Sequence, residues 1–149
     1  MHLEGTYTFN AAREIVWGML QDPNVIGSIM PGSHGLEQIG ENQYQSVLEV
    51  KVGPVNGRFE STIELADINA PESYKLLMTG KGPAGHVTGE GIIRLTYADG
   101  VTTMHYNGDA KVGGRIAAVG QRLLDVAAKS IAKQSLNSLA KKIEERINE

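Results

Sequence analysis

The sequence predicts one α+β domain in which a curved antiparallel sheet wraps around a single long C-terminal helix. From Tyr44 to Val112, apolar and polar residues alternate through several consecutive segments, which is typical of antiparallel strands with one covered face. After Arg115 the apolar residues recur at steps of three and four, as they do on a helix with one apolar stripe. A length of 149 residues suits one domain, which we expect to span residues 1–149.

Turn signals divide the alternating residues into separate strands. Gly53-Pro54 and Ala98-Asp99-Gly100 are two of these turns, because glycine and proline interrupt strands and an Asp-Gly pair favours a hairpin. Another strand precedes Asn10, where the same alternation begins near the N-terminus. The expected strands cover residues 3–9, 36–39, 44–52, 59–65, 74–80, 87–97 and 102–112.

Three helices are expected around these strands. Asn10 is positioned to cap a first helix that continues to Leu20, where Asp22-Pro23 interrupts the helical spacing. A short second helix follows over residues 24–29. The third is expected to run without a break from Arg115 to Arg146. At ~1.5 Å per residue it would be about 48 Å long and would extend beyond the sheet.

Composition excludes several classes of function. With 14 basic and 17 acidic residues, the chain has no basic stripe for a nucleic-acid backbone, so we expect no nucleic-acid partner. The absence of cysteine excludes disulfides, thiolate nucleophiles and thiolate metal sites. No apolar run approaches the length of a membrane span, and residues 1–10 do not resemble a signal peptide. We therefore expect a cytoplasmic protein.

The sequence also lacks a recognisable catalytic or metal-binding motif. Its four histidines share no metal-ligand spacing, and no serine lies in a nucleophile elbow. The glycine-rich segment at residues 80–85 is followed by a strand, whereas a phosphate-binding loop must be followed by a helix. We expect no catalytic residue, no metal and no cofactor.

Four glycines occupy positions of the covered face where a sheet core normally carries Val, Ile or Phe: Gly80, Gly89, Gly91 and Gly108. One explanation is structural, in that these glycines let the sheet bend sharply and let the helix approach closely. The other is functional, in that small residues leave an apolar cavity between sheet and helix that is large enough for a ligand. Both explanations remain open at this point.

If the cavity exists, its walls come from three parts of the chain: the sheet, the C-terminal helix and the two short helices. From the sheet we expect Leu48, Val50, Phe59, Ile63, Leu76, Met78, Ile93, Met104 and Tyr106, from the long helix Val119, Leu123 and Val126, and from the short-helix segment Trp17, Leu20, Ile29 and Met30.

An ordered series of short motifs resembles the CoxG family of carbon monoxide dehydrogenase subunits, in the START-related, Bet v 1-like helix-grip superfamily. The likeness extends from Leu3 to about Leu139. The motifs are Val16-Trp17, Leu20, Asp22-Pro23, Ile29, Pro31-Gly32, Gly80-Lys81-Gly82, Gly113-Gly114-Arg115-Ile116-Ala117 and Val119-Gly120-Gln121-Arg122-Leu123-Leu124.

This resemblance implies a seven-stranded sheet that grips the C-terminal helix around an apolar cavity, with two short helices after the first strand. It further implies an accessory role beside a molybdenum-containing CO dehydrogenase or related hydroxylase. In that role the protein would carry a lipid- or quinone-like molecule or recruit the enzyme to the membrane. Transient contact of the long helix with the inner membrane surface, through its lysines, would be compatible with this role.

Three hypotheses about function follow. The first is a non-enzymatic carrier that encloses an apolar or amphipathic molecule. The second is a cyclase or hydrolase of the same superfamily acting on a bulky apolar substrate, for which the covered face offers few polar groups. The third is an interaction protein that docks on a larger partner and binds no ligand.

Overall fold

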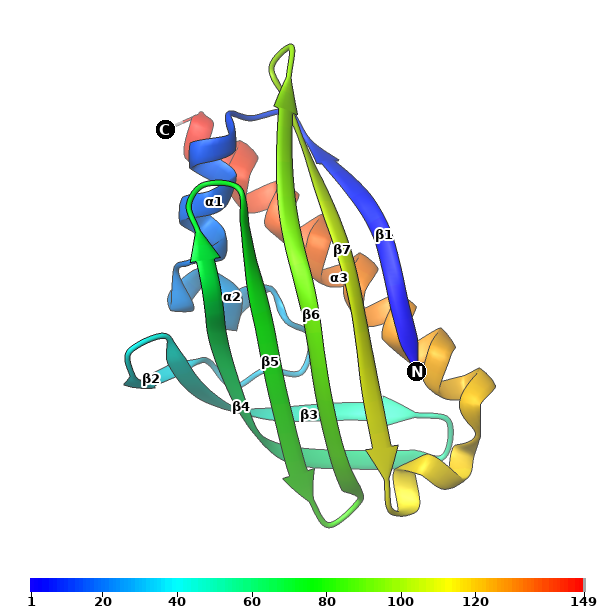
Figure 1. The fold of residues 1–149 in the computed structure, drawn as a ribbon. Helices are drawn as coiled ribbons and strands as arrows, with labels where there is room; N and C mark the ends of the chain where they lie inside the picture. The colour runs from blue at the N-terminus through cyan, green and yellow to red at the C-terminus, as the bar shows by residue number, and fades with distance from the viewer. Residues whose placement is uncertain (149) are drawn as a thin grey trace.

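A computed structural model describes residues 1–148, and in it seven strands form one antiparallel sheet (Figure 1). The order across the sheet is β1-β7-β6-β5-β4-β3-β2, so the first and last strands are neighbours. The predicted fold class and the number of strands are confirmed. The strands are β1 (His2–Phe9), β2 (Glu37–Gly40), β3 (Gln43–Val52), β4 (Val55–Asn69), β5 (Ser73–Gly82), β6 (Gly85–Ala98) and β7 (Val101–Gly113).

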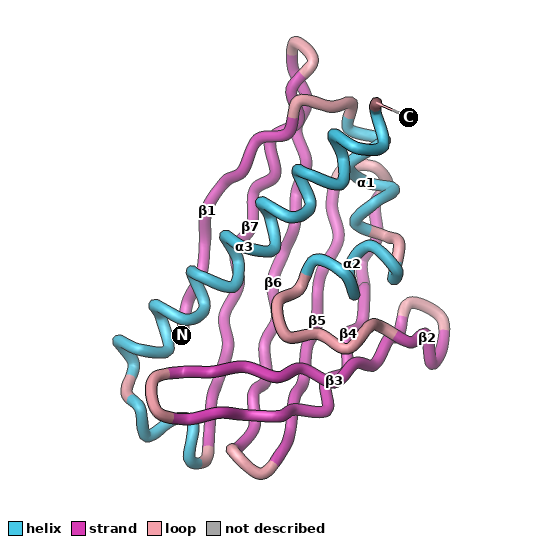
Figure 2. Tube along the Cα trace, turned by 180° about the vertical axis from the view of Figure 1, so that it is seen from behind, coloured by secondary structure: helices cyan, strands magenta, loops and turns pink. Residues whose placement is uncertain are grey.

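The helices lie on the concave side of this sheet. α1 (Arg13–Leu20) and α2 (Pro23–Ile29) follow β1, and α3 (Gln121–Ile147) crosses the concave side obliquely (Figure 2). The β3–β4 hairpin runs across the direction of β5, β6 and β7, which gives the sheet its strong curvature (Figure 1). None of the helices in the described part of the chain combines the length and apolar character that a bilayer-spanning segment needs.

The prediction of one unbroken helix from Arg115 was wrong. Residues Arg115–Val119 form a short 3₁₀ helix, η1, and α3 begins only at Gln121. Gly120 separates them with φ +97°, a backbone conformation that ends regular helix and that glycine adopts without strain. With 27 residues, α3 is about 40 Å long.

The prediction that Asn10 caps the first helix was also wrong. α1 is preceded by Ala12, which makes no side-chain capping bond. The side-chain cap occurs at α2 instead, where the Asn24 backbone N–H donates to Asp22 Oδ1 at 2.9 Å. Pro23 fills the first helical position, where its missing N–H is not needed.

The buried apolar side chains form two separate clusters. The first joins α1, α2 and the C-terminal half of α3 to one end of the sheet, and the second joins η1 and the start of α3 to the other end. The first consists of Phe9, Ala11, Val16, Trp17, Met19, Leu20, Val25, Ile29, Tyr44, Ile63, Leu65, Tyr74, Ile93, Leu95, Met104, Leu136, Leu139 and Ile143. The second consists of Val52, Phe59, Ala84, Ile116 and Leu124.

The first cluster anchors α3, and a matched pair of leucines in this helix tests that role. Leu139 is completely buried in the cluster, whereas Leu123 is 41% exposed. We expect Leu139→Ala to lower the free energy of unfolding by about 2–5 kcal/mol, because it removes buried contacts and leaves a cavity. Leu123→Ala should lower it by less than about 1 kcal/mol. Urea denaturation measures both, and equal losses would contradict the anchoring role.

Candidate functional site

A row of small and polar residues crosses the sheet between the two clusters of buried side chains. Ser46, Ser61 and Gly80 pair directly across β3, β4 and β5. On β4, Phe59 precedes this row and belongs to the second cluster, while Ile63 follows it and belongs to the first. Since successive inward side chains of one strand are two residues apart, the row marks the seam between the two clusters.

Beside this seam, the inward residues at the middle of the concave face are small or only half-buried. Gly89, Gly91 and Gly108 place no side chain there, and the inward residues around them are only half-buried. We call this region the central inner face and define it by Leu76, Met78, Val87, Gly89, Gly91, Tyr106, Gly108 and Ala110.

The opposing stretch of α3 is also incompletely covered. Ile131 comes seven residues after the buried Leu124 and therefore lies on the same side of the helix, yet it is 37% exposed. Ala127 and Ala128, on the same stretch, are half-buried and small. The main contacts of α3 are with α1, α2, β1, β3 and η1, at the two ends and the edges of the sheet. The residues of the central inner face and Ile131 in the middle of α3 therefore both keep some exposure to solvent.

A depression of about 290 Å³ borders the central inner face where β7 passes the start of α3. Ala110 and Val112 of β7 and Leu124 of α3 contribute to its wall, together with Met1, Lys111, Ala117 and Gln121. Because Ala110 pairs with Gly89, this depression lies directly beside the glycines. It reaches the central inner face at Ala110.

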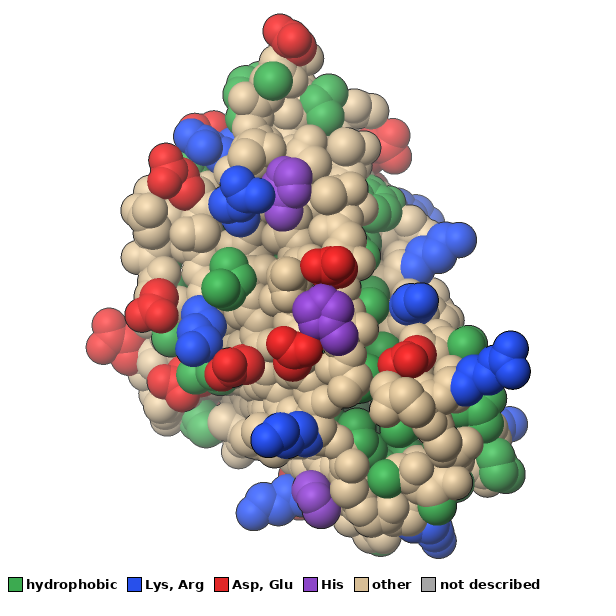
Figure 3. Space-filling model, turned by 45° about the vertical axis from the view of Figure 1, so that its right-hand side comes forward, with side chains coloured by type: hydrophobic (Ala, Val, Ile, Leu, Met, Phe, Trp, Pro, Cys, Tyr) green, Lys and Arg blue, Asp and Glu red, His purple; other side chains and the backbone are tan. Residues whose placement is uncertain are grey.

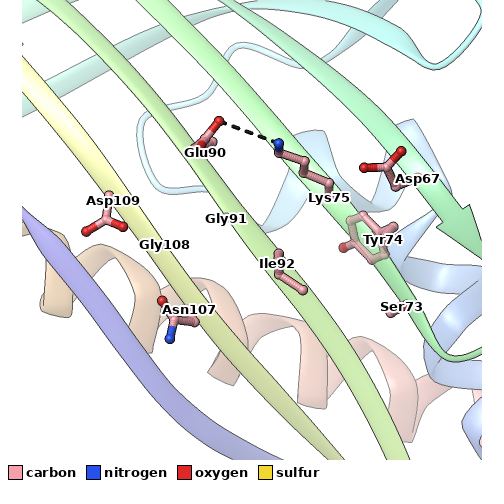
Figure 4. A pocket seen from close by; sticks show the side chains of 10 residues that line it. All are labelled: Asp67, Ser73, Tyr74, Lys75, Glu90, Gly91, Ile92, Asn107, Gly108 and Asp109. Carbon is pink, nitrogen blue, oxygen red and sulfur yellow. Dashed lines mark ion pairs between the residues drawn. The ribbon is translucent and has the colours of Figure 1, made fainter.

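A second depression, of about 380 Å³, lies on the opposite, convex face and has a different character (Figure 4). Its side chains are mostly polar, and Lys75 Nζ lies 3.7 Å from Glu90 Oε2 within it. Acidic, basic and histidine side chains are interspersed over the neighbouring surface (Figure 3). An exposed polar hollow of mixed charge is not the apolar cavity that the sequence predicts.

The histidines lie outside the central inner face. His2 Nδ1 is 2.7 Å from Asp109 Oδ1, and hydrogen bonds to Asp109 and then Glu4 raise the pKa of His2 above its ordinary value. His34 Nε2 is 3.3 Å from Glu49 Oε2. Within the described residues, no three His, Asp or Glu side chains gather closely enough to hold a metal ion.

Steric contacts explain two of the four glycines. A Cβ on Gly108 would lie 2.9 Å from the Glu90 carbonyl oxygen, and one on Gly91 would lie 3.1 Å from the Asn107 carbonyl oxygen. Gly91 and Gly108 pair with each other, so the sheet bends too tightly here for a side chain on either strand. The atoms nearest to a Cβ on any of the four glycines belong to neighbouring strands rather than to α3. Close approach of the helix is therefore not the reason for these glycines.

The structure divides the expected site residues into three groups. Seven are buried within the clusters, and seven are half-buried, where a ligand could touch them. The buried residues are Trp17, Leu20, Ile29, Phe59, Ile63, Ile93 and Met104, and the half-buried ones are Met30, Leu48, Val50, Leu76, Met78, Tyr106 and Val119.

The remaining two residues, Leu123 and Val126, are 41% and 61% exposed. Here the structure differs from the expectation, because the break at Gly120 sets the rotation of α3 and turns Leu124 inward instead. Sequence reasoning missed Leu124 as a residue that faces the sheet. Its spacing of three and seven residues from Ala127 and Ile131, which the apolar stripe of this segment includes, was the available signal.

Comparison with known proteins identifies the family. The family model for CoxG, a carbon monoxide dehydrogenase subunit, matches residues 5–144. The chain belongs to the CoxG family. No curated protein sequence matches it significantly.

Several solved structures are similar to this CoxG-family chain. A conserved protein from Geobacillus kaustophilus has 36% identity and a TM-score of 0.93, with 97% of this chain and 96% of that chain covered. The ZhuI aromatase/cyclase from Streptomyces sp. R1128 has 18% identity and a TM-score of 0.69, with 99% and 95% covered. A START superfamily protein from Mycobacterium smegmatis has 13% identity and a TM-score of 0.70, with 97% of each chain covered. The last two similarities show a shared fold.

The steric account of the glycines makes a prediction for two of them. Gly108→Ala should lower the free energy of unfolding by about 1–3 kcal/mol, because its Cβ would press on the Glu90 carbonyl. A Cβ on Gly89 would meet its nearest atom at 3.4 Å, an ordinary contact. Gly89→Ala should therefore leave stability unchanged or raise it by about 0.4–1 kcal/mol. Thermal or urea unfolding of both variants measures the difference, and a Gly108→Ala protein as stable as wild type would contradict the account.

Proposed function

We propose that this CoxG-family protein binds an apolar or amphipathic molecule, lipid- or quinone-like, between the central inner face and α3. The observation that supports this most strongly is the half-buried, uncharged middle of the concave face, with the exposed Ile131 opposite it. Proteins normally fill such interiors to the density of an organic crystal. A space that apolar side chains line but do not fill is suited to an apolar guest.

Removal of the guest from water supplies the binding energy. At ~25 cal/mol per Å², enclosing about 200–400 Å² of hydrocarbon gives roughly 5–10 kcal/mol before the cost of ordering the guest. Met78 lies in the middle of the wall, and its flexible thioether adapts to guests of irregular shape. No reactive group is needed for this kind of binding, so the proposed role is non-enzymatic.

The family name extends the proposal to a partner. As a CoxG-family protein, the chain would serve a molybdenum-containing CO dehydrogenase-type hydroxylase, by delivering its guest or by recruiting the enzyme to the membrane. We place this role in the cytoplasm, with transient contact at the inner membrane surface. Lys129, Lys133 and Lys141 lie on the exposed side of α3, where they could contact anionic headgroups.

The aromatase/cyclase fold similarity raises the enzymatic alternative, which the chemistry of the site does not favour. Acid–base catalysis requires positioned titratable groups inside the cavity. The residues of the central inner face are apolar except for the Tyr106 hydroxyl, and the adjoining seam adds only serine hydroxyls. The same fold hosts different functions, so the residues of the site decide between them.

Filling the central inner face should abolish binding of a neutral apolar probe. Gly89→Val adds a branched side chain to that face, whereas Thr88→Val changes the adjacent, exposed residue on the opposite face of β6. We expect Gly89→Val to weaken binding of N-phenyl-1-naphthylamine about ten-fold or more, because it occupies the space. Thr88→Val should bind like wild type.

Fluorescence titration of the probe measures both affinities, and unfolding curves check that the variants fold. Failure of wild type to bind the probe, or equal binding by wild type and Gly89→Val, would contradict the proposed function.

A further inference from the structure

Ser61 stands out among the buried polar residues of this protein. Among the described residues, the buried polar side chains other than aromatic ones are Ser46, Ser61 and Thr102. The Ser46 hydroxyl donates to the Gly35 carbonyl, and the Thr102 hydroxyl donates to the Ala11 carbonyl at 2.7 Å. Ser61 is 3% exposed, and none of the side-chain hydrogen bonds between described residues involves its hydroxyl. Its oxygen is not among the polar atoms that are sealed from solvent without a partner, which are Arg13 Nε and Gln21 Nε2. The Ser61 hydroxyl is therefore open to a partner from outside the chain, either water or a bound molecule.

The glycine opposite Ser61 leaves room for such a partner. Ser61 pairs with Gly80 on β5, and a Cβ on Gly80 would lie 3.3 Å from Ser61 Oγ and 3.7 Å from Phe59 Cβ. The absence of that Cβ therefore leaves a notch beside the hydroxyl. The notch adjoins Met78 on β5 and Val87 on β6, which are both half-buried members of the central inner face.

Within the described residues, none of the charged side chains of β3 to β7 faces this notch. The acidic, basic and histidine residues of β5, β6 and β7 alternate with the inward residues and lie on the convex face. The row that holds Ser61 contains only Ser46, Gly80, Val87 and Val112. An ionised carboxylate or phosphate placed here would lose its hydration and gain no opposite charge, which is strongly unfavourable. A hydroxyl or carbonyl would instead exchange one hydrogen bond with water for one with Ser61.

We infer that the guest of the central inner face carries one uncharged hydrogen-bonding group, which binds the Ser61 hydroxyl in the notch beside Gly80. The inference rests on the proposed function and specifies the chemistry of its ligand: an apolar chain or ring system with a hydroxyl, ketone or ester group. The polar end lies at the seam between the two clusters, and the apolar part lies against Met78, the glycines and the middle of α3.

The test compares two guests that differ by one hydroxyl. Dodecane and 1-dodecanol are each titrated against N-phenyl-1-naphthylamine bound to wild type and to Ser61→Ala. We expect Ser61→Ala to weaken 1-dodecanol about five-fold or more, as the loss of one hydrogen bond does. The same substitution should leave the affinity for dodecane unchanged. Dodecanoate at pH 8 should displace the probe from wild type more weakly than 1-dodecanol does.

Two control variants separate the role of Ser61 from general effects. Ser46→Ala removes a buried hydroxyl from the same row, but one already bonded within the protein, so the ratio of the two affinities should not change. Tyr106→Phe removes the hydroxyl of the central inner face itself and tests the alternative that the polar end of the guest binds there. Gly80→Ala places a methyl group in the notch and should weaken 1-dodecanol selectively, which covers the case that Ser61→Ala folds poorly.

The outcomes distinguish this inference from the proposed function. If wild type binds both guests and Ser61→Ala and Gly80→Ala leave the ratio unchanged, the inference is overturned while the proposed function stands. If Tyr106→Phe instead removes the preference for 1-dodecanol over dodecane, the polar end of the guest binds at Tyr106 and the inference is equally overturned. If neither guest displaces the probe from wild type, both fail together.

Discussion

The burial of Leu136, Leu139 and Ile143 against α1, α2 and one end of the sheet is the constraint on which the rest of the structure depends. These residues hold the C-terminal half of α3 firmly at that end, while Leu124 and η1 hold its start at the other. A straight helix fixed at both ends of a strongly curved sheet cannot also follow the sheet's concave middle. The half-buried central inner face is a consequence of this geometry, and the small residues there do not fill it.

The glycines contribute to the same result in two ways. Gly91 and Gly108 permit the tight bend, since side chains there would meet the backbone of the neighbouring strand. A Cβ on Gly89 would make only an ordinary contact at 3.4 Å, whereas one on Gly80 would press on Ser61 Oγ at 3.3 Å. At Gly89 the missing side chain therefore mainly leaves space. The sequence alone could not separate the two effects, because both require the same residue on the same face. Distances to the neighbouring strands distinguish them.

Period-two patterning was enough to predict the sheet, because alternation of residues such as Thr102, Met104 and Tyr106 with polar neighbours directly reports one covered face. The rotation of α3 could not be predicted in the same way. In the sequence, one apolar stripe runs through Ile116, Leu123 and Val126. The backbone at Gly120 interrupts the helix, so a different set of the later residues faces the sheet. The same difference between strands and helix applies to the candidate site. Its strand residues face inward as expected, but from the helix Leu124 faces them, and Leu123 and Val126 do not.

Fold similarity alone would not decide the function, because the chemistry of the concave face carries that distinction. The solved structures of similar fold include an aromatase/cyclase, and one fold can host both an enzymatic activity and simple binding. The uncharged lining of the central inner face and the serine hydroxyls at the seam between the clusters support the proposed enclosure of a guest rather than chemistry on it.

Methyl NMR during titration with N-phenyl-1-naphthylamine tests the central claim most directly, because it reports where an apolar molecule lies. The account predicts chemical-shift changes at the methyl groups of Met78 and Ile131, on the two sides of the unfilled space, and none at Ile92 on the convex face. Changes confined to Ile92, or none at Met78 and Ile131 at saturating probe, would contradict it.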